Sequence, residues 1–568
     1  MAILLHRRRH PQIENASSAG GGVTRGKSTD NGPPGWADHG SGFMGRDFTP
    51  RWIANAAQFR HFNQFNDKLR PGFNPEFLVT IMSSQEKPNW DVNHAWLDVP
   101  RMLPPKRIAR ERSADFREIY ALYDVDAVRA QASRCIECPD ALCVSACPLT
   151  NRIPEWLALA AQGKFDEAAQ ISEATSNMPE VCGRLCPQER LCEGACILNS
   201  RSTPVTIGAI EVFLLEYAFA HGGLDSVVAV PNGFRVACVG SGPASMSCAD
   251  ELAKRGFAVT IFEAQKLPGG LLMNGIPAFK LEKSVVDRRL DLLDKRGVKI
   301  QLGTVVGRDV ALRDLLGEYD AVFLGIGCEQ PKPLDIPGAE LGGVHPAMPF
   351  LIQKNVTAST GLAPIDCRGK RVVVLGGGDT AMDCLRTSIR GGAKSTVCVY
   401  RRDLQNMPGS RKEYLNAVEE GARFLFLTNP IKLEGDAAGH AAKLHCVRME
   451  LGQPDGSGRR KPLPVAGSEF ILDADLVLVA YGFDSVPFPP GSDFAAIEVN
   501  DWGGIVVDEN QMTKTSGVFS GGDAVRGAQL VVHAVRDGRQ AAEGIVRWLA
   551  TKPGPKREPA PVAAVQPE

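Results

Sequence analysis

The chain has 568 residues, of which 44% are hydrophobic and 23% charged, and its formal net charge is −1. At roughly 100–200 residues per domain, this length predicts three or four globular domains. The charge balance excludes a general attraction to nucleic acid or anionic membranes, and no apolar run approaches the roughly 20 residues that span a bilayer. The first nine residues place apolar side chains before basic ones, the reverse of a secretory signal, so we expect a cytoplasmic, reducing location.

Residues 1–95 form an N-terminal extension whose role the sequence does not indicate. Residues 17–42 are rich in Gly, Ser, Asn and Pro, which is typical of a flexible linker. Residues 43–96 contain many aromatic side chains, so we expect this stretch to pack against the rest of the chain or against a partner. At the other end, residues 554–568 are rich in Pro and Ala and predict a loose tail.

Residues 96–230 combine helical patterns, such as Ile153–Ala169 and Ile207–Phe219, with eight of the fifteen cysteines. In a large cytoplasmic chain, such a dense block favours metal binding over disulfides. Its two halves are Cys135-x2-Cys138-x4-Cys143-x3-Cys147-Pro148 and Cys182-x3-Cys186-Pro187-x4-Cys192-x3-Cys196.

The spacing of these cysteines indicates iron–sulfur clusters. Short loops let thiolates converge on a cubane, and a proline follows a ligand cysteine in ferredoxin-type runs. The alternative is structural zinc, which usually has paired C-x2–4-C hooks; the second half contains no C-x2-C hook. Covalent haem attachment is excluded because Pro139, not His, follows Cys138.

The first glycine-rich turn lies between a predicted strand, Val236–Val239, and a predicted helix, Met246–Lys254. Such a turn brings backbone N–H groups and a helix N-terminus to a pyrophosphate. The next predicted strand, Val259–Phe262, ends at Glu263, where an acid binds a ribose 2′-hydroxyl. Ser245 replaces the third glycine, but its small side chain preserves helix–strand packing. The residues of the turn are Gly240, Ser241, Gly242, Pro243, Ala244 and Ser245.

The second glycine-rich turn follows a predicted strand, Val372–Leu375, and has a permitted Ala ending. The next predicted strand, Val397–Tyr400, ends in Arg401 and Arg402 instead of an acid. An acid would repel a 2′-phosphate, whereas arginine pairs with it, so this site is predicted to take NADP(H) in preference to NAD(H). The alternative is that both arginines are solvated surface residues. The residues of the turn are Gly376, Gly377, Gly378, Asp379, Thr380 and Ala381.

A third element near the C-terminus predicts contacts to a flavin. Gly517–Asp523 has the pattern of a short strand ending in Gly522 and Asp523, and a helix from about Gln529 to Ile545 follows. The carboxylate can bind a ribityl or pyrophosphate group. The helix N-terminus, at Gln529, Leu530 and Val531, can face the flavin N1/O2 edge and stabilise negative charge on the reduced ring. The alternative is an ordinary turn with a capping Asp.

Together these elements make the chain, from about residue 98 to residue 550, similar to the small (beta) subunit of NADPH-dependent glutamate synthase. It also resembles the flavin half of dihydropyrimidine dehydrogenase and the large subunit of electron-bifurcating transhydrogenases. The stretches that carry the resemblance are Cys147-Pro148-Leu149, Ile153-Pro154-Glu155-Trp156, Cys192-Glu193-Gly194-Ala195-Cys196, Pro204-Val205-Thr206-Ile207, Gly269-Gly270-Leu271-Leu272, Gly275-Ile276-Pro277, Lys280-Leu281-Glu282-Lys283, Asp287-Arg288-Arg289, Gly376–Thr380, Gly521–Gly527 and Asp537–Ala542.

The resemblance implies an α/β fold in which a helical domain with two iron–sulfur clusters precedes two Rossmann-like domains of the adrenodoxin-reductase and glutathione-reductase type. The NADP domain is inserted in the FAD domain. The expected division is 96–230 for the iron–sulfur domain, 231–365 and 484–553 for the two parts of the FAD domain, and 366–483 for the NADP(H) domain. Gly270 and Leu271 join the expected FAD contacts.

The resemblance also implies that ligation interleaves the two cysteine halves. One cluster uses Cys135, Cys138, Cys143 and Cys196. The other uses Cys147, Cys186, Cys192 and, in the position where relatives have Gln or Glu, Glu211. Cys182 is then not a ligand, although a sequential interpretation of the spacing would make it one. The alternative for Glu211 is an ordinary acid on the helix surface.

The function implied is electron transfer from NADPH through FAD and two [4Fe-4S] clusters to a large partner subunit that forms glutamate from glutamine and 2-oxoglutarate. Hydride transfer between cofactors needs no side chain as general acid or base, so we expect no catalytic residue in this chain. Because the chain starts Met1-Ala2-Ile3, we expect the glutaminase nucleophile on the partner. The alternative acceptor is another redox protein, such as a ferredoxin, a hydrogenase-type subunit or a pyrimidine reductase.

Two other functions remain as alternatives. A dithiol reductase needs a redox cysteine pair beside the flavin. Among the seven scattered cysteines, the two closest in sequence, Cys238 and Cys248, fall on a strand and a helix of the first dinucleotide fold. A non-catalytic scaffold subunit with decayed nucleotide sites has only the atypical Ser245 in its favour.

Overall fold

The computed structural model describes residues 94–224, 229–356, 364–454, 460–485 and 488–555. The linker and the aromatic stretch predicted in the N-terminal extension lie outside the described residues, apart from the last few positions, as does most of the C-terminal tail. None of the helices in the described ranges is long and apolar enough to cross a membrane.

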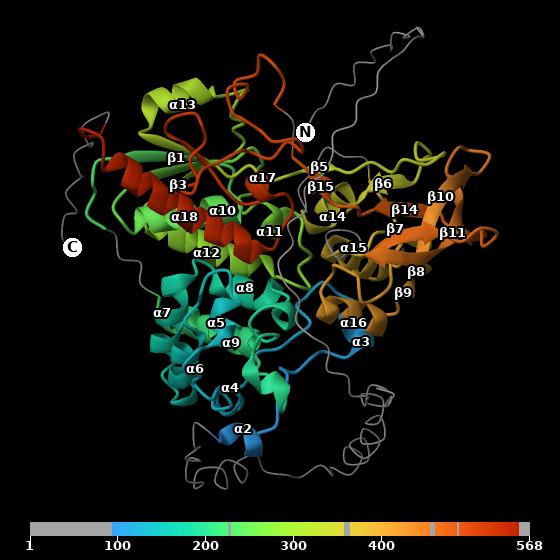
Figure 1. Ribbon diagram of the computed structural model, residues 1–568, viewed down its shortest axis with the longest axis horizontal. Helices are drawn as coiled ribbons and strands as arrows, with labels where there is room; N and C mark the ends of the chain where they lie inside the picture. The colour runs from blue at the N-terminus through green and yellow to red at the C-terminus, as the bar shows by residue number, and fades with distance from the viewer. Residues whose placement is uncertain (1–93, 225–228, 357–363, 455–459, 486–487, 556–568) are drawn as a thin grey trace, which may run out of the picture. The chain divides into compact units, whose positions relative to one another are not determined.

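The first part of the described chain is helical (Figure 1). Its longer helices pack around Trp156, Ile210 and Leu214, which are fully buried. The prediction of one helix over Ile153–Ala169 is wrong: Gly163, with φ of +81°, separates two helices there. The helices are α2 (Ala95–Asp98), α3 (Ala109–Arg112), α4 (Val125–Ala132), α5 (Leu142–Ser145), α6 (Ile153–Ala161), α7 (Phe165–Thr175), α8 (Pro179–Leu185), η2 (Gln188–Arg190), η3 (Ile197–Ser200) and α9 (Ile207–His221).

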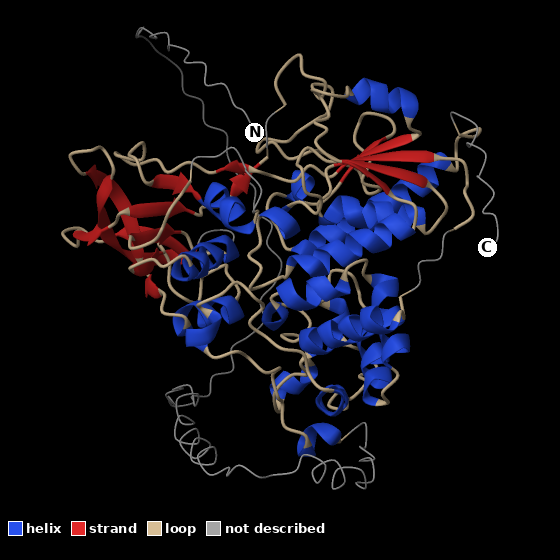
Figure 2. Ribbon diagram, turned by 180° about the vertical axis from the view of Figure 1, so that it is seen from behind, coloured by secondary structure: helices blue, strands red, loops and turns tan. Residues whose placement is uncertain are grey.

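A five-stranded parallel sheet in the order β16-β4-β1-β2-β3 forms the first dinucleotide fold. Strand β16 pairs with β4 although about 200 residues separate them, so the C-terminal segment completes this sheet. Helix α18 packs along α10 beside the sheet (Figure 2). The elements are β1 (Arg235–Val239), α10 (Pro243–Ala253), β2 (Ala258–Phe262), α11 (Leu271–Asn274), α12 (Lys283–Lys295), β3 (Lys299–Gln301), α13 (Leu312–Glu318), β4 (Ala321–Leu324), β16 (Val518–Ser520), α17 (Asp523–Arg526) and α18 (Val531–Leu549).

The second dinucleotide fold is a parallel sheet in the order β6-β14-β7-β8-β9. It lies between the two chain segments that build the first sheet, which confirms the predicted insertion. Its elements are β6 (Val344–Pro346), α14 (Ala347–Asn355), β7 (Arg371–Leu375), α15 (Asp379–Arg390), β8 (Ser395–Val399), α16 (Arg411–Glu419), β9 (Arg423–Leu425) and β14 (Leu476–Val479).

Two smaller sheets accompany the inserted fold. The chain leaves and re-enters the first fold through a short antiparallel ribbon, in which Phe483 pairs with Pro331. The other is an antiparallel sheet between β9 and β14 in the sequence, in which β11 pairs with β10, β12 and β13. The strands are β5 (Gln330–Pro331), β15 (Phe483–Asp484), β10 (Thr428–Gly435), β11 (Ala441–Pro454), β12 (Arg460–Pro464) and β13 (Phe470–Asp473).

One hydrophobic core is shared by the helical domain and the first dinucleotide fold. Leu149, Met178 and Val181 of the helical domain are buried together with Val532 and Val535 of α18. Burial of apolar side chains from both domains favours their association. The cysteine block is therefore held against the helix predicted to face the flavin.

Candidate functional site

The first glycine-rich turn leaves an open space in front of α10. A Cβ atom on Gly240, which has φ of +89°, would lie 2.5 Å from the carbonyl oxygen of Gly325. A Cβ atom on Gly270 would lie 2.8 Å from Cα of Gly242, whereas one on Gly242 would meet nothing within 4 Å. Glycine is therefore required for the close backbone approach, and the space at the helix N-terminus fits the pyrophosphate of a dinucleotide.

The acid predicted for the ribose lies behind the same turn. Glu263 is buried, and its Oε2 accepts a hydrogen bond from the backbone N–H of Ser241 at 2.9 Å. Its Oε1 accepts from the backbone N–H of Gln265 at 2.7 Å. Ser245, the atypical third residue, is fully buried and packs against Gly325. The serine is thus accommodated by a glycine on the facing loop, and its presence does not indicate a decayed site.

The C-terminal element lies against this turn. Gly522 has φ of +71°, and a Cβ atom on it would lie 3.0 Å from Cβ of Ala244. Asp523 accepts a hydrogen bond from the backbone N–H of Gln529 at 3.2 Å, and burial raises the pKa of its carboxyl to about 7. Leu530 is the N-cap residue of α18, so Gln529 and Val531 flank the positive end of this helix.

The second turn repeats the geometry of the first. Gly376 has φ of +131°, and a Cβ atom there would lie 2.3 Å from the carbonyl oxygen of Ala480. A Cβ atom on Gly378 would meet nothing within 4 Å in front of α15. Asp379, the first residue of α15, accepts a hydrogen bond from the backbone N–H of Ser410 at 3.0 Å. The remaining predicted contacts, Thr380 and Ala381, lie in the first turn of this helix.

The two arginines predicted to contact a 2′-phosphate follow β8. Tyr400 is buried between the sheet and Gly377, on which a Cβ atom would lie 2.7 Å from the tyrosine ring. Arg401 is exposed, and Arg402 is half-buried and donates a hydrogen bond to the carbonyl oxygen of Arg460 at 3.3 Å. Both cations lie at the carboxyl edge of the sheet, beside the second turn, where a dinucleotide's ribose binds in such folds.

The fold brings four of the eight clustered cysteines together at one end of the helical domain. Burial raises the pKa of Cys135 to about 12, and the nearby thiols of Cys143, Cys138 and Cys196 raise it as well. Cys196 comes from the second half of the block, immediately before η3. The first three cysteines therefore lie beside the last one.

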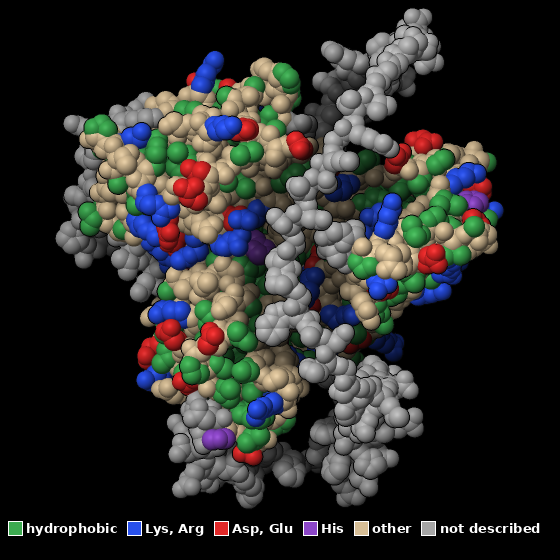
Figure 3. All heavy atoms as spheres, in the orientation of Figure 1, with side chains coloured by type: hydrophobic (Ala, Val, Ile, Leu, Met, Phe, Trp, Pro, Cys, Tyr) green, Lys and Arg blue, Asp and Glu red, His purple; other side chains and the backbone are tan. Residues whose placement is uncertain are grey.

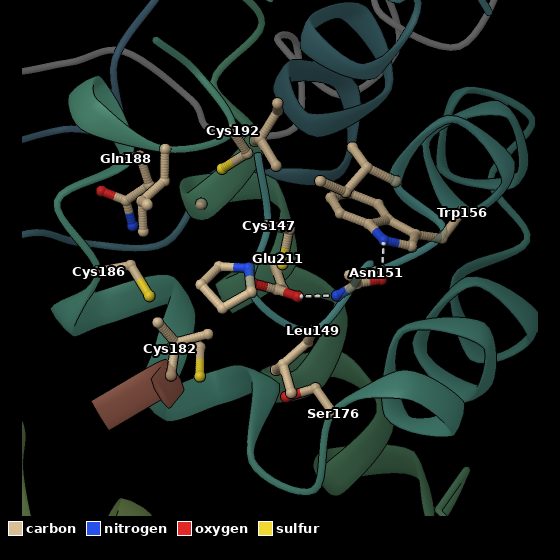
Figure 4. A pocket seen from close by; sticks show the side chains of 16 residues that line it. Cys147, Leu149, Asn151, Trp156, Ser176, Cys182, Cys186, Gln188, Cys192 and Glu211 are labelled. Carbon is tan, nitrogen blue, oxygen red and sulfur yellow. Dashed lines mark hydrogen bonds between the residues drawn. The ribbon is translucent and has the colours of Figure 1, made fainter. Parts of the chain in front are cut away.

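A second group surrounds a cavity between the helical domain and α18 (Figure 4). Side chains of Cys147, Cys186, Cys192 and Glu211 line it, and Glu211 lies on α9. Cys182 of α8 lines the same cavity and is buried. The cavity also reaches Val532, next to the N-terminus of α18.

The cysteine sulfurs of both groups lie where a positively charged iron–sulfur core would stabilise their thiolate form. Burial raises the pKa of Cys143 and of Cys147 to about 11, and it also raises the pKa of Cys192 well above its ordinary value. A hydrogen bond with Cys182 is the main cause that raises the pKa of Cys186. A cysteine that binds metal must be a thiolate, and the iron atoms of a cluster would supply the positive charge that stabilises it.

Zinc and iron–sulfur clusters need different arrangements of their ligands. In the described part of the chain, no three His, Cys, Asp or Glu side chains converge as the ligands of a single metal ion would. A zinc site draws its sulfurs to about 2.3 Å from one ion. A cubane instead distributes its ligands over four irons.

Buried ion pairs fix the helical domain to the first dinucleotide fold. Arg289 of α12 donates to Glu180 at 2.7 Å and to Glu173 at 3.0 Å. Arg539 of α18 donates to Asn177 at 2.8 Å. Because all three partners belong to the helical domain, the distance between the cavity and the N-terminus of α18 is fixed.

The surface near the first cysteine group includes exposed apolar side chains. Leu142 and Ile197, the sequence neighbours of Cys143 and Cys196, are each about half exposed. Figure 3 shows hydrophobic side chains gathered on the surface of the helical domain beside α2 and α4. Exposed apolar side chains that lie together are typical of a protein–protein contact.

Family comparisons agree with this architecture. Residues 112–223 match the family described as dihydropyrimidine dehydrogenase domain II, 4Fe-4S cluster. Residues 234–538 match the pyridine nucleotide-disulphide oxidoreductase family. The predicted iron–sulfur domain and the dinucleotide-binding oxidoreductase domain are therefore both confirmed.

The chain matches several relatives over nearly their whole length. The chain is 45% identical over 470 residues to the glutamate synthase [NADPH] small chain of Escherichia coli K12, which covers 80% of this chain and 98% of that protein. The chain belongs to the glutamate synthase small-chain family. The small chain of Mycobacterium tuberculosis H37Rv is 38% identical over 484 residues, or 81% of this chain and 96% of that one.

Two further similar proteins are not named glutamate synthase small chains. The chain is 43% identical over 485 residues to AegA of E. coli K12, whose name describes it only as an oxidoreductase, and covers 73% of it. Among solved structures, a His57Gln mutant of FprA from M. tuberculosis matches with a TM-score of 0.50 and 22% identity, over 56% of this chain and 85% of FprA. This last likeness concerns the fold alone.

Some contacts in this member of the small-chain family were not predicted from the sequence. Asn151 and Ser172 contact Glu211, and nothing in their spacing indicated this. Cys238 and Cys248 do form a contacting pair of thiols, which the sequence could not show. Both are fully buried under the first turn, so they offer no dithiol that a substrate can reach.

Proposed function

We propose that the chain is the NADPH-oxidising subunit of a cytoplasmic glutamate synthase and passes electrons to a large subunit that forms glutamate from glutamine and 2-oxoglutarate. The observation that carries this proposal is the 45% identity over 98% of the E. coli small chain. The proposed cofactors are FAD, NADPH and two [4Fe-4S] clusters.

We assign residues 231–365 and 484–553 to FAD, 366–483 to NADP(H) and 96–230 to the clusters. Bound NADPH and FAD supply the hydride chemistry, and the clusters carry single electrons. The chain contributes binding and orientation: the two open turns accept pyrophosphates, and the α18 N-terminus stabilises negative charge. Arg401 and Arg402 select NADP(H) through the 2′-phosphate.

The two groups of side chains correspond to two clusters. One site consists of Cys135, Cys138, Cys143 and Cys196. The other consists of Cys147, Cys186, Cys192 and Glu211, with Cys182 beside it. Support comes from the neighbouring thiols of the first group and from the shared cavity of the second.

The two sites differ in what surrounds them. The site with Glu211 opens toward Val532 of α18, so we place it next to the flavin. The site with Cys143 lies beside the half-exposed Leu142 and Ile197, so we place it next to the large subunit. A buried inner site and an outer site at an apolar face suit a chain that delivers electrons to a protein.

Reconstitution tests the proposal. The purified chain is mixed with a glutamate synthase large subunit, and glutamate is measured with glutamine, 2-oxoglutarate and NADPH, with NADH as the matched control. We expect glutamate formation that requires both subunits and prefers NADPH. Flavin bleaching by NADPH without any glutamate would contradict the assigned partner.

The resemblance to AegA supports a second candidate function, in which an oxidoreductase of this architecture serves another acceptor. The same preparation distinguishes the two. Reduction of a ferredoxin by NADPH at a rate above that of glutamate formation would favour this second function.

A further inference from the structure

Glu211 is held by a chain of hydrogen bonds at one of its two carboxylate oxygens. Asn151 Nδ2 donates to Glu211 Oε1 at 2.9 Å, and Ser172 Oγ donates to the same oxygen at 2.8 Å. Trp156 Nε1 donates to Asn151 Oδ1 at 3.0 Å (Figure 4). Trp156 and Ser172 are fully buried, and Asn151 and Glu211 are 4% and 8% exposed.

The indole fixes the direction of the whole chain of hydrogen bonds. An indole N–H can only donate, so the amide oxygen of Asn151 must face Trp156. The NH2 group of Asn151 must then face Glu211, where it requires a hydrogen-bond acceptor. Ser172 Oγ accepts from Asn151 Nδ2 at 3.3 Å, which leaves the serine hydroxyl proton for Glu211. Two donors therefore converge on Oε1 of Glu211.

The other oxygen of Glu211 is left for the cavity. In the described ranges, no hydrogen-bond donor reaches Oε2, while the side chain lines the cavity shared with Cys147, Cys186 and Cys192. A carboxylate can accept two hydrogen bonds on one oxygen and bind iron through the other. Neighbours that bond to a ligand in this way orient it and tune the metal.

We propose that Trp156 and Asn151, with Ser172, are positioning residues that make position 211 specific for a carboxylate ligand and unable to use glutamine. This inference rests on the proposed second cluster. A glutamine whose oxygen faced Asn151 would turn its NH2 group to the iron. An amide NH2 group is only a hydrogen-bond donor and has no lone pair available to bind a metal. In the opposite orientation, its NH2 group would face the NH2 group of Asn151, which leaves buried donors unpaired.

The test reverses the direction of the hydrogen-bond chain. Replacing Trp156 by Phe removes the donor that fixes Asn151, so the amide can turn its oxygen toward position 211. Four proteins are compared: wild type, Glu211→Gln, Trp156→Phe and the double variant. Glu155→Gln, an exposed change on the same helix, is the matched control. The readouts are iron content, the EPR spectrum of the oxidised protein and the reduction potential of the cluster.

For wild type and Glu155→Gln we expect about eight irons and no oxidised [3Fe-4S] signal. Glu211→Gln should lose between one and four irons, with a [3Fe-4S] signal where one is lost. Trp156→Phe alone should keep its iron. The double variant should regain iron toward the wild-type value, because glutamine can then present its oxygen to the cluster.

Two results would overturn the inference. One is a Glu211→Gln protein with full iron and an unchanged potential, and the other is a double variant with no more iron than Glu211→Gln alone. Failure of the proposed second cluster looks different: wild-type protein would then contain about four irons, which Cys143→Ser would remove entirely. Equal FAD content in all variants shows that each has folded.

Discussion

Arg112 and Glu420 are 308 residues apart in the sequence, yet Nε of Arg112 donates a hydrogen bond to Oε1 of Glu420 at 2.9 Å and both side chains are buried. Arg386 and Arg390 donate to the same carboxylate, at 2.9 Å and 2.6 Å. This cluster joins α3, before the cysteine block, to the inserted dinucleotide fold. The inserted fold is therefore tied to the N-terminal side of the molecule by buried charges.

Removing the charge of Glu420 is expected to destabilise the protein strongly. Glu420→Gln leaves buried guanidinium groups short of a carboxylate, which costs about 3–5 kcal/mol in comparable pairs. Glu419→Gln is the matched control, because Glu419 is 43% exposed and such pairs contribute about 0–1 kcal/mol. Urea unfolding measures both, and equal shifts would contradict the prediction.

The same carboxylate predicts a pH dependence. Burial raises the pKa of Glu420, but hydrogen bonds from Arg386 and Arg390 outweigh it and hold the pKa at about 2, below its ordinary value of 4.5. Because the folded pKa is the lower one, the stabilisation is present above pH 4.5 and is lost as the pH falls toward 2. The stability difference between wild type and Glu420→Gln should therefore shrink across this range and stay constant above it.

Reversing the charges after β8 should change the choice of nucleotide. Arg401→Glu combined with Arg402→Glu replaces the partners of a 2′-phosphate by repelling groups. Loss of charge-assisted hydrogen bonds worth about 3 kcal/mol corresponds to roughly 100-fold in kcat/KM for NADPH. The value for NADH should change little. Arg423→Glu, an exposed change at the first residue of the neighbouring strand β9, is the control. Equal losses for both nucleotides would place the 2′-phosphate elsewhere.

Cys143→Ser should remove the outer cluster and leave the flavin half intact. Serine is a poor replacement for a thiolate ligand, so iron should fall by about four atoms per chain. Bleaching of the flavin by NADPH under anaerobic conditions should persist, while glutamate formation with the large subunit should stop. Loss of both clusters would contradict two separate sites.

Cys182→Ser should behave differently from every other change in the block. Cys182 lines the inner cavity but is not among the proposed ligands, so iron content should stay near that of wild type. Because the Cys182 thiol forms a hydrogen bond with Cys186, the potential of the inner cluster should shift when the thiol becomes a hydroxyl. Loss of about four irons would make Cys182 a ligand and would overturn the interleaved assignment.

Introducing charged residues at the exposed apolar side chains of Leu142 and Ile197 should impair delivery of electrons to the partner. Leu142→Asp combined with Ile197→Asp is expected to weaken binding of the large subunit, measured by calorimetry, because apolar side chains that a partner buries are replaced by carboxylates. Flavin reduction by NADPH should be unchanged. Leu463→Asp, an exposed change on β12, is the control; equal effects from both variants would contradict docking at this face.

The sequence by itself determined the local elements and the family. Both glycine-rich turns were recognised because their geometry depends on a few neighbouring residues, such as Gly240 and Gly376, which need positive φ. Strand and helix boundaries around them lie within a few residues of those predicted, since alternation and helix starts are local patterns. The prediction of one helix over Ile153–Ala169 is wrong because Gly163, with positive φ, ends the first helix within a continuous apolar pattern.

Only the tertiary structure decided which distant residues meet. The pairing of β16 with β4, the place of Cys196 beside Cys135 and the contact of Arg112 with Glu420 join segments that no local pattern relates. The chain of hydrogen bonds from Trp156 through Asn151 to Glu211 also depends on how α9 packs against α6. These contacts follow from packing of whole elements, whereas spacing along the chain constrains only near neighbours. The sequence therefore indicated the cofactors, and the structure decided which residues surround the proposed ligands.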